Sequence, residues 1–435
     1  MCYNKCMETI VALATPPGNS GVAVIRISGE NAKEILQKMI CEKLDFTPRM
    51  MYLKNVVAGE VKDNCLVVYF AAPNSFTGED VAEIQSHGGY HLAQMIINQC
   101  IKYGARPAGA GEFSKRAFLN GKLSLDQAEG IMDLINAETD LQASAGSKLL
   151  NGRMQALVQD VANQLTDILA ELEAKLDYPE YEYTQAETTN TLKRLNDIFS
   201  QVSTFIDTSV HGQVIKNGVK VALTGAPNVG KSSLLNALTQ TDKAIVTSVA
   251  GTTRDVIEGE YQYKGILFRL FDTAGIRESA DEVESIGIKR ALNAVEDADI
   301  VLKVFDGTTN YEVQTNKPTI TVGNKSDINK LKHADICVSA KTGENIEKLK
   351  QLIFEKTVGE EINTTNFYLT NARHIECVQR ALASLADAIA SFETTTLDIV
   401  SSQIKSAWHA LGEITGVTSD EAIIDKIFSK FCLGK

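Results

Sequence analysis

Residues 225–232 read Gly225-Ala-Pro-Asn-Val-Gly-Lys231-Ser232 and have the spacing G-x-x-x-x-G-K-S, which is typical of one fold. The alternating apolar residues Val219, Val221 and Leu223 before it are typical of a strand, and residues 233–238 after it favour a helix. In such a turn the backbone N–H groups converge on phosphate oxygens, the lysine neutralises phosphate charge, and the serine hydroxyl can bind Mg²⁺. The sequence therefore predicts a P-loop nucleotide-binding domain.

A second motif indicates which base this domain binds. Asn324-Lys-Ser-Asp327 follows an apolar strand predicted over 319–322. A carboxylate here can accept hydrogen bonds from N1 and N2 of guanine, whereas adenine would leave Asp327 buried and unpaired. Alone, these four residues are a common surface turn, but Asp272-Thr-Ala-Gly275 precedes them and Ser339-Ala-Lys341 follows them. The order of the motifs predicts GTP rather than ATP.

The same motifs supply the other candidate site residues. Asp272 ends a strand predicted over 267–271 and is placed to act on Mg²⁺ through water, while the N–H of Gly275 is placed for the γ-phosphate. Ser232 and Thr253 are the candidate Mg²⁺ ligands, and Lys231 and Asp272 are also candidate catalytic residues. The predicted GTP-binding residues are Asn228, Val229, Gly230, Lys231, Ser232, Ser233, Thr247, Thr252, Thr253, Asp272, Thr273, Ala274, Gly275, Asn324, Lys325, Asp327, Ser339, Ala340 and Lys341.

Hydrolysis of GTP needs a group that orients the attacking water. Many small GTPases use a glutamine directly after the Asp-Thr-Ala-Gly element, but this chain has Ile276 there. Two alternatives follow: hydrolysis is slow, or another residue orients water and another cation takes the place of an arginine finger.

The composition of the chain excludes several classes of protein. The chain has 435 residues and a net charge of −12, from 43 Lys and Arg against 55 Asp and Glu, which excludes a wholly basic protein that coats nucleic acid. The longest apolar run, 65–73, is far below the ~18 residues of a membrane span. The apolar block at 10–14 is shorter than the ~7–15 residues of a secretory signal core. Eight cysteines without a CxxC spacing indicate reduced thiols. We expect no membrane insertion and a cytoplasmic location.

Changes in pattern along the chain predict the fold class, a multidomain α/β protein. Short β-like runs with turns give way near Leu123 to a long amphipathic helix pair, and from Gly218 strands and helices alternate, as in a parallel doubly wound sheet. A helical pattern returns after Asn366. The predicted domains are an α+β N-terminal domain at 1–119, a discontinuous helical domain at 120–216 and 363–435, and an inserted Ras-like P-loop GTPase domain at 217–362.

Further motifs lie outside the predicted GTPase domain. With them, the chain resembles the MnmE (TrmE) family of tRNA modification GTPases over essentially its whole length. The motifs are Thr15-Pro-Pro-Gly18, Arg26-Ile-Ser-Gly29, Asn74-Ser-Phe-Thr-Gly-Glu-Asp80, His87-Gly-Gly89, Gly111-Glu-Phe-Ser114, Arg116-Ala-Phe-Leu-Asn120 and the terminal Phe431-Cys-Leu-Gly-Lys435.

The resemblance implies a potassium-stimulated GTPase whose GTPase domains pair across a homodimer. It implies K⁺ bound by side chains of Asn228 and Thr252 and carbonyls of Thr247 and Val249, in the place of an arginine finger. Glu284 matches the family's water-orienting catalytic glutamate; the alternative is an exposed helix carboxylate.

The resemblance also makes the N-terminal domain a folate-binding and dimerisation domain. Arg26, Glu83, Lys122 and Lys435 match positions around 5-formyl- or 5,10-methylene-tetrahydrofolate, and without the resemblance each would more often be a surface charge. Cationic groups suit a glutamate tail, and a carboxylate suits the donor edge of a pterin. Cys432 is either a functional thiol or, more commonly for such a residue, a packing residue.

A partner protein is implied as well. With an FAD-dependent MnmG (GidA)-type partner, in a heterotetramer-like complex, the chain would add an aminomethyl or carboxymethylaminomethyl group to C5 of the wobble uridine, position 34 of tRNA. FAD would belong to the partner only. The segments 306–324 and 327–339 look compressed relative to the family. The alternatives are a stand-alone GTP-dependent switch in ribosome or RNA assembly and a nucleotide-regulated folate-dependent one-carbon transferase.

Overall fold

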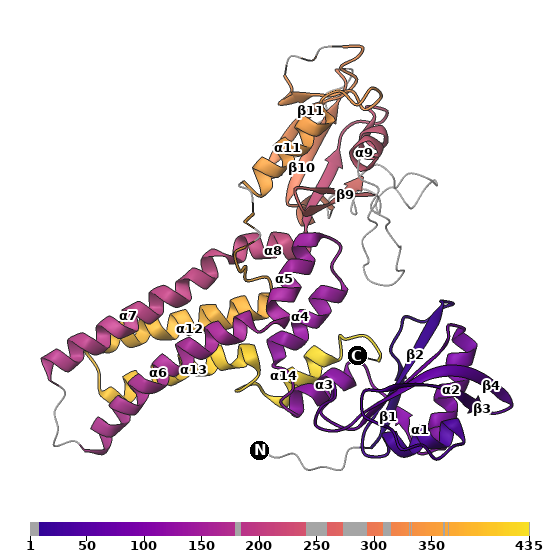
Figure 1. Cartoon of the computed structure of the whole chain (residues 1–435). Helices are drawn as coiled ribbons and strands as arrows, with labels where there is room; N and C mark the ends of the chain where they lie inside the picture. The colour runs from indigo at the N-terminus through magenta and orange to yellow at the C-terminus, as the bar shows by residue number, and fades with distance from the viewer. Residues whose placement is uncertain are drawn as a thin grey trace, which may run out of the picture. The chain divides into compact units, whose positions relative to one another are not determined.

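The computed structural model describes residues 8–178, 184–240, 259–272, 294–307, 315–329, 331, 333–359, 362–363 and 365–434 (Figure 1). The chain divides into two compact units. The first contains Met1–Met132, Lys148–Leu192 and Ala383–Lys435, and the second contains Asp133–Ser147 and Lys193–Leu382. The long helices α7 and α12 run through the boundaries of these units, so the domain limits expected from sequence stay predictions.

The N-terminal part of the first unit is a six-stranded sheet with the order β3-β4-β5-β2-β1-β6. Neighbouring strands are antiparallel except β1 and β6. Helices α1 and α2 pack against the sheet with buried residues such as Ile35, Leu36 and Ile96, which confirms the α+β prediction. The elements are β1 (Ile10–Leu13), β2 (Val22–Ser28), α1 (Ala32–Ile40), β3 (Met51–Ala58), β4 (Val61–Phe70), β5 (Val81–His87), α2 (Tyr90–Lys102) and β6 (Arg106–Pro107).

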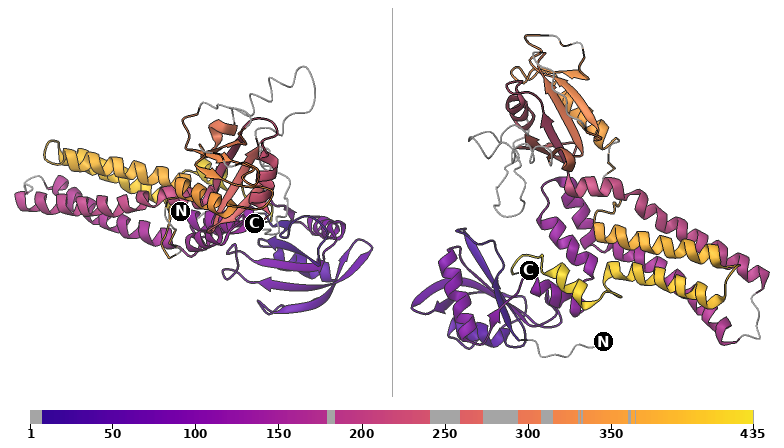
Figure 2. Two further views of the ribbon diagram at one scale, coloured as in Figure 1. Left: turned by 90° about the horizontal axis from the view of Figure 1, so that it is seen from above. Right: turned by 180° about the vertical axis from the view of Figure 1, so that it is seen from behind.

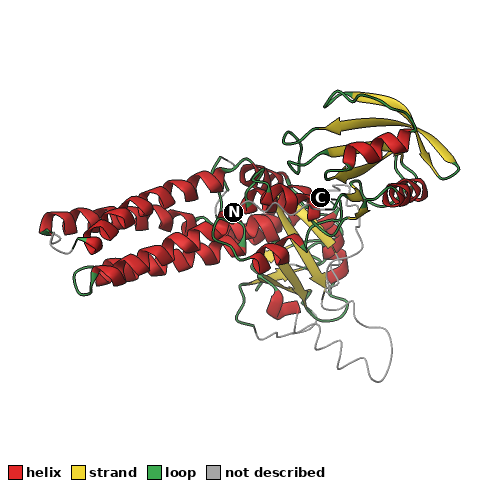
Figure 3. Cartoon of the chain, turned by 90° about the horizontal axis from the view of Figure 1, so that it is seen from below, coloured by secondary structure: helices red, strands yellow, loops and turns green. Residues whose placement is uncertain are grey.

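The long helices lie outside both sheets (Figures 2 and 3). The helices at 125–135, 140–150, 185–207 and 372–391 each cross a boundary between the two units. In α6, Val161, Leu165, Ile168 and Leu172 are buried at helical spacing, and the helix packs along α13. The helix pair expected over 123–177 is in fact three helices, because the chain breaks at 136–139 and again at Gly152, whose φ of 76° is left-handed. The helices are α3 (Glu112–Leu119), α4 (Leu125–Ile135), α5 (Asp140–Leu150), α6 (Arg153–Asp177), α7 (Gln185–Asp207), α12 (Ala372–Ser391), α13 (Leu397–Thr415) and α14 (Glu421–Phe428).

The end of the chain docks on the N-terminal domain within the first unit. Leu433 forms a β-bridge with Ala110, and the N–H of Gly111 donates to the carbonyl of Cys432 at 3.4 Å. At Gly434, with a φ of 87°, a Cβ atom would lie 2.1 Å from the carbonyl oxygen of Leu13, so only glycine fits. The sequence motif at the C-terminus is thus part of the N-terminal domain's surface.

The second unit contains a six-stranded sheet with the order β12-β11-β10-β7-β9-β8. Every neighbouring pair is parallel except β8 with β9. This confirms the predicted doubly wound sheet and adds an antiparallel edge strand that the sequence pattern did not indicate. The elements are α8 (Ser209–Asn217), β7 (Val219–Thr224), α9 (Lys231–Thr239), β8 (Gly259–Tyr263), β9 (Ile266–Asp272), β10 (Ile300–Phe305), β11 (Thr319–Gly323), β12 (Ile336–Cys337) and α11 (Ile346–Thr357).

The connections from β10 to β11 and from β11 to β12 are short. Their described residues, 306–307, 315–318, 324–329, 331 and 333–335, contain no helix. The compression expected from the sequence stays a prediction. Across the described part of the chain, no helix is both long and apolar enough to cross a membrane.

Candidate nucleotide-binding site

The predicted phosphate loop joins β7 to α9 at the carboxyl edge of the parallel sheet, where ligands bind in such folds. Two of its glycines are required by close contacts. A Cβ atom at Gly225 would lie 2.2 Å from the carbonyl oxygen of Val304, and one at Gly230 would lie 2.4 Å from Nδ2 of Asn324. Asn228 has a left-handed φ of 64° between them. The loop is therefore held tightly against β10 and the segment after β11.

Lys231 is the first residue of α9 and is 5% exposed. Its Nζ donates to the carbonyls of Gly225 at 2.8 Å and Ala226 at 2.9 Å, so the ammonium lies inside the curve of the loop. The hydroxyl of Ser232 donates to Oδ2 of Asp272, at the end of β9, over 3.3 Å. A cation and two hard oxygen ligands of the kind Mg²⁺ prefers thus meet where a phosphate chain would lie.

The predicted guanine-binding loop is bonded to the phosphate loop. Nδ2 of Asn324 donates to the carbonyl of Val229 at 3.0 Å, and Nζ of Lys325 donates to that of Asn228 at 3.0 Å. Oδ1 of Asn324 accepts the N–H of Ala340 at 3.2 Å. Three motifs far apart in the sequence therefore lie together at this edge of the sheet.

The structure places the other predicted GTP-site residues in two groups. Ser339 donates its hydroxyl to Asp327 at 2.7 Å, while Ser233 and Lys341 are exposed beside the loops. The remaining predicted residues lie outside the described part of the chain: Thr247, Val249, Thr252, Thr253, Thr273, Ala274, Gly275 and Glu284.

The predicted folate residues of the first unit are partly brought together. Arg26 on β2 and Glu83 on β5 are cross-strand partners, and Nε of Arg26 lies 2.8 Å from Oε1 of Glu83. The Arg26 guanidinium lies 5.5 Å from the ring centre of Phe76 and donates to the carbonyl of Gly434 at 3.4 Å. Lys122 donates to the carbonyl of Pro73 at 2.9 Å, and Lys435 lies outside the described residues. These groups offer both cationic donors and a carboxylate acceptor.

An ion-pair cluster around Arg116 is not among the features predicted from the sequence. Arg116 is 1% exposed and donates to Glu79 at 2.9 Å, to Glu112 at 2.9 Å and to the carbonyl of Glu8. Burial raises the pKa of Glu112, but hydrogen bonds from Arg106, the Gly109 N–H and Arg116 outweigh it and lower that pKa to about 2. The spacing of Glu112 and Arg116, four residues apart in two quoted motifs, was the available signal.

The cysteines differ in exposure. Cys432 is exposed, which does not fit a packing role. Burial, with a smaller contribution from a hydrogen bond to Asp63, raises the pKa of Cys65 to about 12, and burial raises the pKa of Cys100 to about 12. Both thiols are therefore held in the protonated form at neutral pH.

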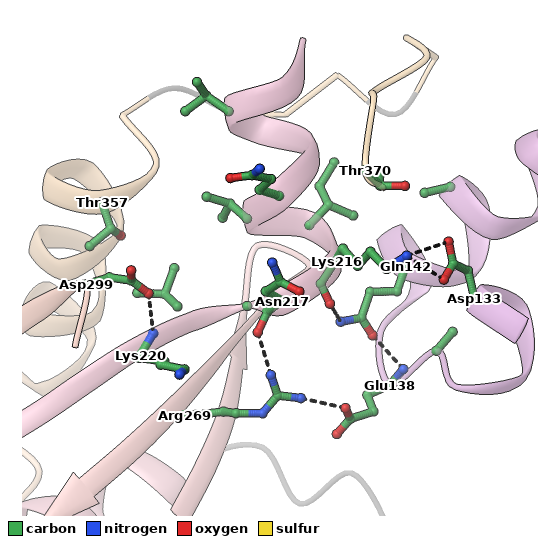
Figure 4. A pocket seen from close by; sticks show the side chains of 18 of the residues that line it. Asp133, Glu138, Gln142, Lys216, Asn217, Lys220, Arg269, Asp299, Thr357 and Thr370 are labelled. Atoms are coloured by element: carbon green, nitrogen blue, oxygen red, sulfur yellow. Dashed lines mark hydrogen bonds and ion pairs between the residues drawn. The ribbon is translucent and has the colours of Figure 1, made fainter. Parts of the chain in front are cut away.

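A half-open cleft of about 810 Å³ lies within the second unit (Figure 4). Arg269 on β9 donates to Glu138 at 2.7 Å and to the carbonyl of Asn217, and Lys216 lies 2.8 Å from Asp133. Lys220 and Asp299, at the amino ends of β7 and β10, line it too, so the cleft is at the opposite edge of the sheet from the phosphate loop. These contacts attach the segment Asp133–Ser147 to the strand that ends in Asp272.

The strand order, the glycine-lysine loop after β7, the aspartate that ends β9 and the Asn-Lys-x-Asp loop after β11 define a P-loop GTPase fold. Two family profiles match the chain: "MnmE helical domain" over residues 125–432 and "GTP-binding protein TrmE N-terminus" over residues 9–122. The chain belongs to the MnmE family of tRNA modification GTPases.

Relatives agree with this assignment. The tRNA modification GTPase MnmE of Lactobacillus delbrueckii subsp. bulgaricus is 37% identical, covering 98% of both chains. That of Staphylococcus aureus is 37% identical over 99% of this chain and 100% of its own. Among solved structures, Era of Aquifex aeolicus bound to GDP and AlF4⁻ aligns at 25% identity over 41% of this chain and 68% of its own, with a TM-score of 0.26.

Proposed function

We propose that this chain hydrolyses GTP with Mg²⁺ and uses the reaction in the modification of tRNA. The observation that carries the proposal is the convergence of Lys231, Ser232, Asp272 and the 324–327 loop at one edge of a parallel sheet, in a member of the MnmE family. Lys231 would neutralise the phosphates, and Asp327 would accept from guanine N1 and N2. Ser232 and Thr253 would bind Mg²⁺, with Asp272 acting through water.

Potassium is the proposed activating cation. Asn228 lies within the phosphate loop at a left-handed φ of 64°, and its side-chain oxygen would be a K⁺ ligand there. Thr247, Val249 and Thr252 would complete the K⁺ ligands, and Glu284 would orient water because Ile276 cannot. Pairing of two GTPase domains in a homodimer would enclose this site. The bound K⁺ would then supply the positive charge that an arginine finger otherwise brings.

The first unit is the proposed folate site. Arg26 and Lys122, with Lys435, would bind the acidic tail of a formyl- or methylene-tetrahydrofolate, and Glu83 would accept from a pterin. The residue that best suits a folate ligand is Arg26, whose side chain is 21% exposed and lies near the rings of Phe76 and Phe113 and beside Glu83. Bound folate would supply a one-carbon unit. Cys432, exposed beside this site, is a candidate functional thiol.

The proposed reaction also requires partners. An FAD-dependent MnmG-type protein would join the dimer, and together they would add an aminomethyl or carboxymethylaminomethyl group to C5 of uridine 34 in the cytoplasm. In this proposal the predicted domain 1–119 would bind folate and form the dimer, and the predicted domain 217–362 would bind and hydrolyse GTP. The predicted helical domain, 120–216 with 363–435, would connect the two.

Mass spectrometry of tRNA nucleosides from a gene-deletion strain tests this proposal. We expect unmodified uridine at position 34, with recovery on expression of the natural chain and none on expression of the Lys231→Ala variant. An unchanged nucleoside profile would contradict tRNA modification and favour a stand-alone switch. One-carbon transfer by the isolated chain would instead favour a folate-dependent transferase.

A further inference from the structure

We propose that Asp306 is a positioning residue of the nucleotide site, which holds the ammonium of Lys325 against the phosphate loop and thereby slows nucleotide release. This inference rests on the proposed function, because it concerns the same GTP site. Asp306 belongs to none of the motifs that identify this site in the sequence.

The geometry places Asp306 directly after β10, the strand between β7 and β11. Its Oδ2 lies 2.6 Å from Nζ of Lys325, and the same Nζ donates to the carbonyl of Asn228 at 3.0 Å. The Asp306 side chain is 6% exposed, whereas that of Lys325 is 39% exposed. One ammonium therefore joins a buried carboxylate to the phosphate loop.

The pair acts on two strained backbone positions. Lys325 and Asn228 have left-handed φ values of 62° and 64°. This conformation is unfavourable for residues with a Cβ atom and persists where surrounding contacts enforce it. Without the carboxylate of Asp306, the half-exposed ammonium could turn to solvent and release the carbonyl of Asn228. Charge-assisted hydrogen bonds such as these are stronger than neutral ones.

The contact of Lys325 with Asp306 and Asn228 affects how a bound nucleotide leaves the site. The neighbouring Asn324 already bonds the loop at the carbonyl of Val229, so Asn324 and Lys325 connect the base loop and the phosphate loop at successive residues. A nucleotide that contacts both loops leaves only when they separate. Loss of the contact between Asp306 and Lys325 should therefore accelerate nucleotide release, with little change in the fold.

The test is the dissociation rate of a fluorescent mant-GDP from the full-length protein, measured by stopped flow with excess GDP. We expect Asp306→Asn to dissociate about tenfold faster than the natural chain, as for the loss of one charge-assisted hydrogen bond. Asp306→Glu, which keeps the charge, should recover part of this effect. Asp299→Asn is the matched control, because Asp299 precedes the same strand at its other end and accepts the Lys220 N–H at 2.8 Å.

A double-mutant cycle separates positioning from general destabilisation. If Asp306 acts through Lys325, then Asp306→Asn should add little in a Lys325→Ala background, where the ammonium is absent. Additive effects, or a rate equal to that of the natural chain, would overturn the inference; Asp306→Glu keeps the cycle usable if Asp306→Asn folds poorly. Failure of the natural chain to bind mant-GDP would instead contradict the proposed function.

Discussion

The hydroxyl of Ser339 donates a hydrogen bond to Oδ1 of Asp327 at 2.7 Å, which joins the loop after β12 to the predicted guanine-binding carboxylate. This bond leaves the second carboxylate oxygen for other donors and fixes the plane of the group.

The first prediction concerns base specificity. Asp327→Asn should weaken GTP binding about a hundredfold or more, because an amide cannot accept from both N1 and N2 of guanine. The same amide can donate to the C2 carbonyl of xanthine, so XTP should bind better than to the natural chain. Competition binding with both nucleotides measures this. Asp335→Asn is the control, because Oδ2 of Asp335 accepts the Thr321 N–H at 2.7 Å and Asp335 belongs to none of the predicted nucleotide-binding motifs. Unchanged specificity in Asp327→Asn would count against the guanine assignment.

The second prediction concerns the activating cation. GTP turnover should rise severalfold when Na⁺ is replaced by K⁺ at constant ionic strength, because bound K⁺ would supply the positive charge that an arginine finger otherwise brings. Asn228→Ala should lose this dependence. Turnover that is the same in both salts would rule out the potassium assignment.

The third prediction separates binding from chemistry. Glu284→Ala should keep its nucleotide affinity and lose hydrolysis, because a water-orienting carboxylate acts in the transition state and not in ground-state binding. Equilibrium binding and single-turnover hydrolysis give the two quantities. A parallel loss of both would assign Glu284 a structural role.

The fourth prediction concerns the attachment of Asp133–Ser147. Arg269→Ala removes hydrogen bonds to Glu138, Glu260 and the Asn217 carbonyl, and should lower the free energy of unfolding by about 1–3 kcal/mol. Urea denaturation measures the change. Lys348→Ala, at an exposed site on α11, is expected to change it by less than about 0.5 kcal/mol; equal effects would show that these contacts contribute nothing to stability.

The fifth prediction concerns acid stability. The pKa of Glu112 is lowered from its ordinary 4.5 to about 2 in the folded chain, so the charged form stabilises the fold. This contribution is complete above about pH 4.5 and is lost as the pH falls toward 2. Glu112→Gln should therefore be less stable than the natural chain at pH 7, and the difference should shrink below pH 4.5.

Unfolding free energies measured from pH 7 to pH 2 test the sign of this linkage. Glu8→Gln is the control, because Glu8 pairs with the same Arg106 but is 76% exposed. A difference between Glu112→Gln and the natural chain that stays constant with pH would contradict the assignment.

The chain's local patterns were enough to predict the phosphate loop, the strands around it and the Asn-Lys-x-Asp turn. These elements depend on residues close in sequence, since glycine conformations and side-chain alternation are local properties. The same patterns did not separate α4, α5 and α6, because the break at Gly152 depends on a single left-handed residue inside a helical pattern.

The order of residues along the chain is enough to identify the P-loop, the predicted base-binding turn and the motifs of the MnmE family. Three other contacts are seen only in the folded chain: Leu433 pairs with Ala110, Arg116 joins Glu79 to Glu112, and Asp306 binds Lys325. Each of these depends on groups brought together across the fold, where burial makes a charge or a backbone bond effective. Apart from the four-residue spacing of Glu112 and Arg116, these pairings join residues far apart in the chain and leave no local pattern from which they could be predicted.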